Sequence, residues 1–200
     1  ASLYDLADSL ATLMDEMQGE GVSAEAIANL DVTDQSGHWE RAKTFINIAQ
    51  SYIDLSQDTP DTEARQRIIV QNLVERWEHT PPKHPIILAG STGSRGTTLM
   101  LMQAIARLPN GAVILPGFDF DMPTDVWTSL SDAMLSEDHP QFRFHKLLLS
   151  LETSSDDVIP WADDAPAAPA RNKLVSLALR PAPVTDAWFS EGPHLTGIAE

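Results

Sequence analysis

The chain of 200 residues is 42% hydrophobic and 21% charged, values typical of a folded protein that exclude global disorder. Its 13 Lys and Arg stand against 29 Asp and Glu, and the resulting net charge of −16 opposes binding to nucleic-acid phosphates. Because the chain has no Cys, it has no disulfide, thiolate metal site or Cys nucleophile, which fits a cytoplasmic protein. It also has no apolar run of ~18 residues, so no membrane-spanning helix is predicted.

Residues 1–80 are predicted to form a helical domain. An apolar stripe from Leu3 to Met17 predicts the first helix, which Gly19 and Gly21 end. Ser23 is predicted to cap a short helix that runs to residue 30. Two longer helices are expected, one beginning at residue 36 or 37 and one over 61–78, and Pro81 and Pro82 stop the last of them.

This helical domain is also the most acidic part of the chain. No Lys or Arg precedes Arg41, whereas Asp and Glu recur throughout the same stretch. We interpret these acidic residues as a solvated helix face, with a surface for a basic partner as the alternative.

Residues 81–135 are predicted to contain a βαβ core. The short apolar runs Ile86–Ala89 and Ala112–Leu115 are typical of strands buried on both faces, and residues 97–108 between them have a helical pattern. Strand, helix and strand within about 30 residues imply two parallel strands joined by a right-handed crossover. The predicted fold class is therefore α/β, with a helical N-terminal block and a small parallel βαβ core.

The remaining residues, 136–200, are expected to be a helical and loop extension of the same domain. Helices are predicted over 125–134, 141–151 and 170–179, with an exposed loop over 162–170 rich in Asp, Ala and Pro. The five Trp residues lack interleaved basic residues, so we interpret them as packing anchors and not as a surface for base stacking.

The turn after the first strand is the segment most similar to a phosphate-binding loop. A P-loop has a Lys directly after its last Gly, and Thr97 occupies that position here. If the turn does contact an anion or DNA, the candidate residues are Gly93, Ser94 and Arg95, together with Arg107 at the far end of the helix. The alternative is that small residues merely permit a tight turn.

No metal, cofactor or catalytic group is predicted. Asp119 and Asp121 follow the second strand and are able to hold Mg²⁺, but the same residues also fit an ordinary turn. The six His residues have no metal-ligand spacing, and no Ser occupies a nucleophile elbow.

Several long stretches of the chain resemble the alphaproteobacterial type of the AddB family, double-strand-break repair proteins that partner the helicase–nuclease AddA. These stretches extend over nearly the whole chain: Leu13–Gly21, His84–Ser94, Ala104–Gly117, Asp138–Phe142 and Leu174–Pro181. The resemblance implies an internal fragment of the helicase-like N-terminal half, part of a superfamily 1 helicase-like domain, without the C-terminal nuclease domain.

The same resemblance implies that this helicase-like domain is inactivated. In active relatives, a strand like residues 86–89 ends in an acidic pair that binds Mg²⁺ and orients the attacking water. Ala89 and Gly90 occupy the corresponding positions, and neither is able to ligate a metal. The expected role is thus a non-catalytic segment of the cytoplasmic AddAB complex in recombinational DNA repair, without ATP hydrolysis.

The expected partners are an AddA-type subunit and DNA, the latter bound through the full-length protein and weakly or not at all through this fragment. Two other functions remain open. One is a small phosphate- or nucleotide-binding enzyme domain that uses the turn over residues 90–96, and the other is an acidic protein-interaction module.

Overall fold

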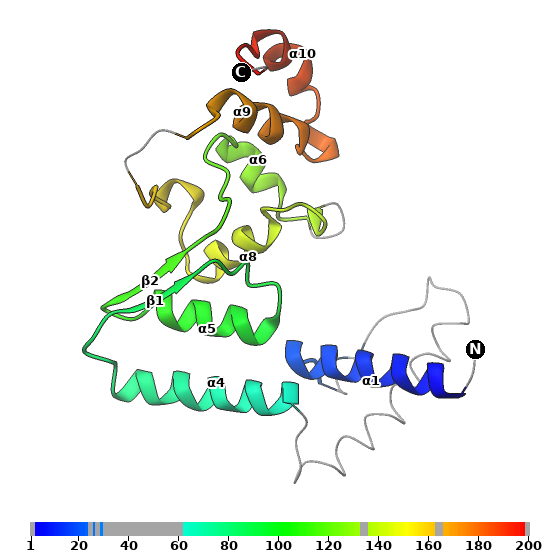
Figure 1. Ribbon diagram of the computed structural model, residues 1–200, viewed down its shortest axis with the longest axis vertical. Helices are drawn as coiled ribbons and strands as arrows, with labels where there is room; N and C mark the ends of the chain where they lie inside the picture. The colour runs from blue at the N-terminus through cyan, green and yellow to red at the C-terminus, as the bar shows by residue number, and fades with distance from the viewer. Residues whose placement is uncertain are drawn as a thin grey trace. The chain divides into compact units, whose positions relative to one another are not determined.

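The computed structural model describes residues 3–23, 26, 29, 62–132, 136–162 and 166–198. It is a mixed α/β structure, mostly helical, with a small two-stranded parallel sheet (Figure 1). The chain divides into two compact units, Ala1–Pro81 with Arg95–Leu101, and Pro82–Ser94 with Met102–Glu200. None of the helices in these described segments is long and apolar enough to cross a membrane.

The first unit contains helices α1 (Leu3–Glu20) and α4 (Thr62–His79), which pack against each other, and the first turns of α5 (Gly96–Ala106) (Figure 1). Both predicted helices are confirmed within a residue or two of their expected ends. Ser23 Oγ accepts a hydrogen bond from the Ala26 N–H at 3.1 Å, as an N-cap residue should. Most of the predicted helix after Ser23, and all of the helix expected from residue 36 or 37, lie outside the described residues.

The second unit contains the parallel sheet, formed by β1 (Ile86–Ala89) and β2 (Gly111–Ile114) (Figure 1). Ile86 pairs with Gly111 and Ala89 with Ile114, so the predicted parallel pairing is confirmed. β2 begins one residue earlier than expected. The helix between the strands ends at Ala106. The Arg107 amide is shared between the Gln103 and Ala104 carbonyls, and the Leu108 amide bonds three residues back, to the Ile105 carbonyl at 3.1 Å.

The prediction that both strands are buried on both faces is wrong for β1, whereas all four residues of β2 are half-buried. Side chains of β1 alternate between half-buried and exposed, and Ile87 is 55% exposed. A strand is buried on both faces only where other elements cover both sides of its sheet. In the described part of the chain, the sheet has two strands, and one face of β1 is left uncovered.

The core of the second unit lies between α6 (Thr124–Ser129) and α8 (Phe142–Ser150). Phe118, directly after β2, stacks on Trp127 with ring centroids 4.8 Å apart and packs against this core. The core side chains are Met122, Val126, Trp127, Leu130, Phe144 and Leu148. Met102 and Ile105 of α5 are also buried.

Three predictions for this unit need correction. The helix expected over 125–134 ends at Ser129, because the Leu130 and Ser131 amides bond carbonyls three residues back. Trp127 is a packing anchor as predicted, but Trp161 is 73% exposed and Trp188 is also exposed. Trp39 lies outside the described residues.

The C-terminal part of the second unit consists of short helices. The predicted helix appears as α9 (Pro169–Ala178), and it contacts α10 (Ala187–Glu191). Single 3₁₀ turns are formed by η1 (Ser155–Asp157), η2 (Ala182–Val184) and η3 (Gly192–His194). The sequence pattern did not predict α10 or these 3₁₀ turns, because segments of three to five residues are too short to show a period.

Candidate functional site

Two backbone amides of the turn after β1, in the second unit, donate hydrogen bonds to other groups of the protein. The Gly90 N–H donates to the Ile114 carbonyl at 3.2 Å, which continues the sheet ladder, and the Gly93 N–H donates to Ser91 Oγ at 3.3 Å. Gly90 and Gly93 have φ angles of 79° and 67°, in the left-handed region that favours Gly. These two glycines are therefore required by the shape of the turn itself.

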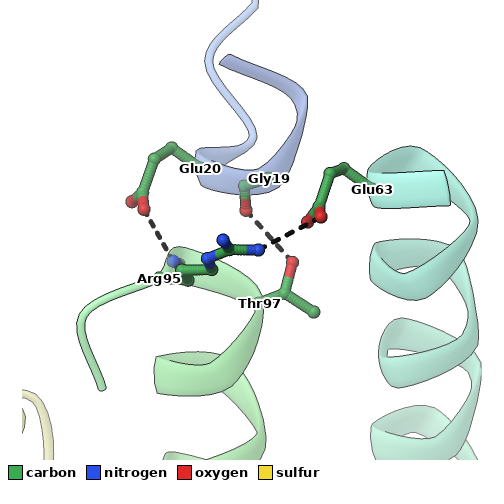
Figure 2. A network of polar contacts seen from close by, with 6 residues as sticks. Gly19, Glu20, Glu63, Arg95 and Thr97 are labelled. Carbon is green, nitrogen blue, oxygen red and sulfur yellow. Dashed lines mark hydrogen bonds and ion pairs between the residues drawn. The ribbon is translucent and has the colours of Figure 1, made fainter. Parts of the chain in front are cut away.

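The start of α5, in the first unit, is capped by a carboxylate from another helix. The Arg95 carbonyl accepts the first intrahelical bond, from the Leu99 amide at 2.9 Å, so Gly96 is the first helical residue. Its N–H has no partner within the helix. Glu20 Oε1, from the last residue of α1, accepts this hydrogen bond at 2.8 Å (Figure 2).

The contact between α1 and α5 also supplies hydrogen-bond donors to a carbonyl group at the end of α1. Thr97 Oγ1 donates to the Gly19 carbonyl at 3.1 Å, and Arg67 Nη1, from α4, donates to the same oxygen at 3.1 Å (Figure 2 shows the Thr97 bond). The carbonyl-rich end of α1 thus meets the amide-rich end of α5, an arrangement that the opposite signs of the helix dipoles favour.

Position 96 has no room for a side chain, because α1 and α5 approach closely there. A Cβ atom at position 96 would lie 2.8 Å from Glu20 Oε2, 3.0 Å from Glu20 Cα and 3.1 Å from the Gly19 carbonyl oxygen. Two of these three neighbours are backbone atoms, which do not rotate away. The Gly that resembles part of a phosphate loop therefore allows the end of α1 to contact the start of α5.

The two Arg candidates both contact the protein itself, and each lies in a different unit. Arg95 Nη1 pairs with Glu63 Oε1, on α4, at 3.1 Å, although the Arg95 side chain remains 70% exposed (Figure 2). Arg107 Nη2 donates to the Ser150 carbonyl at 2.6 Å. Arg95 precedes α5 and Arg107 follows it, so these two candidates lie at opposite ends of that helix, with Gly93 and Ser94 directly before Arg95.

The acidic candidates after β2 form a turn. Asp119 Oδ1 accepts the Asp121 N–H at 3.0 Å, the local bond that Asp side chains make in turns. Among the described residues, no three His, Asp or Glu side chains come together as metal ligands.

Burial favours the neutral form of two histidines of the second unit. Burial lowers the pKa of His139, an effect that the Leu179 carbonyl and the negative charge of Asp119 partly offset. Burial alone lowers the pKa of His145, whose Nε2 lies 3.1 Å from Ser131 Oγ. His139 Nδ1 accepts a hydrogen bond from the Gln141 N–H at 3.1 Å.

Two concave regions of the second unit were not predicted from the sequence. An apolar groove of about 550 Å³ runs along β2 and includes the exposed Phe120, Ile159 and Trp161. A smaller polar pocket of about 290 Å³ is formed by α9, α10 and η3. Each is assembled from segments distant in the sequence, so no local motif indicates either of them.

Comparisons with protein-family models, with curated proteins and with solved structures found no match.

Proposed function

We propose that the chain is a non-catalytic, helicase-like segment of an AddB-type subunit, which works with an AddA-type helicase–nuclease subunit in recombinational repair of DNA double-strand breaks. The cytoplasm is the corresponding compartment. The long sequence stretches that resemble the AddB family support this assignment, and the parallel βαβ arrangement of β1, α5 and β2 is compatible with a helicase-like core.

The observation that carries the non-catalytic part of the proposal is the cap on α5. In nucleotide-binding folds, free amides and positive potential at the start of such a helix bind phosphate. Here the Gly96 amide is bound to the Glu20 carboxylate, whose negative charge would repel an incoming phosphate. Residues that are able to ligate Mg²⁺ are also missing at Ala89 and Gly90, where β1 ends.

The role left to such a segment is that of a scaffold. A net charge of −16 favours a basic protein surface over DNA, and α1 presents exposed acidic side chains at Asp8, Asp15 and Glu16. In this proposal the acidic helical unit contributes to binding the partner subunit, and DNA is bound mainly by other segments of the full-length protein.

A pull-down with an AddA-type subunit tests the partner. We expect retention at about 150 mM salt and at about 500 mM salt, because a specific interface includes apolar contacts that salt does not screen. A basic protein of unrelated fold serves as the control and should be lost at the higher salt. Equal retention of both proteins would favour a general acidic interaction module over an AddB-type segment.

An ATPase assay separates the scaffold from a nucleotide-binding enzyme. We expect no Mg²⁺-dependent turnover by the isolated chain, with or without single-stranded DNA. Turnover above ~1 s⁻¹, a rate expected of working phosphoryl-transfer enzymes, would contradict the proposal if Gly93→Val, which strains the turn, abolished it.

A further inference from the structure

The apolar groove of the second unit follows one edge of β2. Every residue from Gly111 to Leu115 lines this groove, and none of the four residues of β1 does. Successive side chains of a strand point to opposite faces of the sheet, so a groove on one face would be lined by alternate residues only. A groove lined by consecutive residues lies beside the strand, and this one therefore lies along the edge of β2 that faces away from β1.

The backbone of β2 has hydrogen-bonding groups at this outer edge. The carbonyls of Asn110 and Ile114 accept hydrogen bonds from the first residue of β1 and from the residue after it, at 3.0 and 3.2 Å. In a parallel pair, every second residue turns its N–H and C=O toward the neighbouring strand. The backbone groups of Val113 and Leu115 therefore point to the outer edge, where no described residue outside the two strands bonds to them.

The sequence of β2 does not protect this edge from a further strand. Natural proteins shield a free edge with Lys or other charged residues, with Pro, or with a bulge. The residues of β2 read Gly-Ala-Val-Ile, without a charge or a Pro. Sheets usually contain about four to six strands, whereas the sheet in the described part of the chain has two. The outer edge of β2 is thus suited to accept another strand.

The other side chains that line the groove are mostly apolar. Phe120, Ile159 and Trp161 are 55%, 80% and 73% exposed, so a bound segment is able to contact them. Asp157 is the one charged residue in the lining, and it is exposed as well. The groove, with a volume of about 550 Å³, therefore suits a segment that carries apolar side chains and a positive charge.

We propose that this groove binds an extended, basic and apolar segment of another protein, which adds to β2 as a third strand, independently of the function proposed above. The backbone of the segment pairs with Val113 and Leu115, and its apolar side chains contact the groove. A basic residue of the segment lies near Asp157. A second copy of this chain is a poor occupant, because each copy has a net charge of −16.

The test is fluorescence anisotropy of a labelled peptide, Lys-Val-Thr-Val-Thr-Val-Lys with blocked ends, titrated with the full chain. Its β-branched residues favour the extended conformation, and its Lys residues supply the positive charge. We expect saturable binding with a Kd below about 1 mM. The absence of saturable binding would refute the proposal.

A backbone-modified peptide separates strand addition from simple apolar contact. Methylation of the amide nitrogens of the central Val and the next Thr removes two adjacent donors, one of which faces β2 in either register. This peptide should bind at least about tenfold more weakly, because it loses a backbone hydrogen bond and introduces a methyl group into the pairing edge. Equal affinity of the methylated and unmethylated peptides would show that no strand is added.

Two further comparisons test the groove and its charge. Trp161→Ala should raise the Kd about tenfold, as expected for loss of an aromatic contact. Trp188→Ala is the matched control, because Trp188 is also exposed but lies on α10, outside the groove. A peptide with Glu in place of both Lys residues should bind about tenfold more weakly. Equal Kd values for the two Trp variants, or for the two peptides, would contradict the proposed site or the proposed charge of its occupant.

Sedimentation of the chain alone tests the alternative occupant. We expect a monomer at the concentrations used for the titration. A dimer that Trp161→Ala dissociates and Trp188→Ala does not would show that a second copy occupies the groove, and the proposal would then be wrong.

Discussion

The negative charge of Glu20 is unfavourable at the end of its own helix, α1, and favourable at the start of α5. As the last residue of α1, its negative charge lies at the negative end of that helix dipole. Its carboxylate nevertheless binds the Gly96 amide at 2.8 Å, at the positive end of α5. One side chain, from the end of α1, therefore caps the start of α5.

Glu20→Ala should destabilise the first unit by about 1 kcal/mol, a usual cost of losing a helix cap. Glu20→Gln should cost less, because the amide oxygen still accepts the Gly96 hydrogen bond. Glu16→Ala, an exposed residue of the same helix, is the matched control and should change stability by less than about 0.5 kcal/mol. Urea unfolding measures all three, and equal effects of Glu20→Ala and Glu16→Ala would contradict the capping role.

Two histidines of the second unit, the buried His145 and the partly buried His139, are expected to make stability depend on pH. Because burial lowers the pKa values of His139 and His145 below the ordinary 6.5, the unfolded chain binds more protons than the folded chain in the interval between. The free energy of unfolding should therefore fall as pH drops through about 6.5, and stop falling below the folded-state pKa values.

Urea unfolding at pH 7.5, 6.5 and 5.5 checks this dependence. His145→Asn should flatten it, whereas His79→Gln, an exposed histidine of α4, should not. The pKa of the exposed Asp157 is lowered by hydrogen bonds from the Ser154 amide and the Thr153 and Ser154 hydroxyls, so its titration lies below this range. An NMR titration that finds an ordinary pKa for His145 would refute the explanation, even if the variant fails to fold.

The two faces of β1 differ in how much they contribute to the second unit. Ile86 and Leu88 are half-buried, whereas Ile87 is mostly exposed. In a strand, alternate side chains point to opposite faces, so a continuous apolar run does not by itself reveal that one face is uncovered. Whether a face of β1 is buried depends on which elements pack against that face.

Ile87→Thr should change stability by less than about 0.5 kcal/mol, because Thr also suits a strand and little apolar surface is lost from the core. Leu88→Ala should cost about 1–2 kcal/mol, less than for a fully buried Leu. Thermal unfolding compares the two variants. A larger loss for Ile87→Thr than for Leu88→Ala would mean that the exposed face is covered in the folded protein.

For the molecule as a whole, we expect the net charge to affect DNA binding more than any local group of basic residues does. Two basic residues flank α5, and both contact other groups of the protein. Arg95 forms an ion pair with Glu63, and Arg107 donates a hydrogen bond to the Ser150 carbonyl. Counterion release requires free Lys and Arg on a common surface, and a net charge of −16 works against it.

The isolated chain should bind labelled single- and double-stranded DNA with a Kd weaker than ~10⁻⁶ M at about 50 mM salt, beyond the tight end of ordinary non-specific binding. Fluorescence anisotropy measures this Kd. Arg95→Ala and Arg107→Ala should leave the weak signal unchanged. Tighter binding that Arg95→Ala removes would show that the start of α5 contacts nucleic acid.

Features that depend on near neighbours in the chain could be predicted from the amino-acid sequence. Apolar spacing predicted α1, α4, α5, α8 and α9, and the strand–helix–strand order predicted parallel pairing. These features follow from the 3.6- and 2-residue periods of the backbone and from the handedness of crossovers, which operate within about 30 residues. Weak affinity for DNA is also expected from composition, and it stays a prediction for the anisotropy measurement to check.

Contacts between distant segments of the chain could not be predicted in this way and are seen in the folded structure. The bond from Gly96 to Glu20 joins residues 76 positions apart, and no local pattern distinguishes Glu20 from the other acidic residues of α1. The pocket beside α9 combines Asp121 with residues 173–195, and the exposure of Ile87 depends on which elements cover the sheet. Such contacts arise from the packing of distant segments, whose partners are chosen by the whole fold and not by local periodicity.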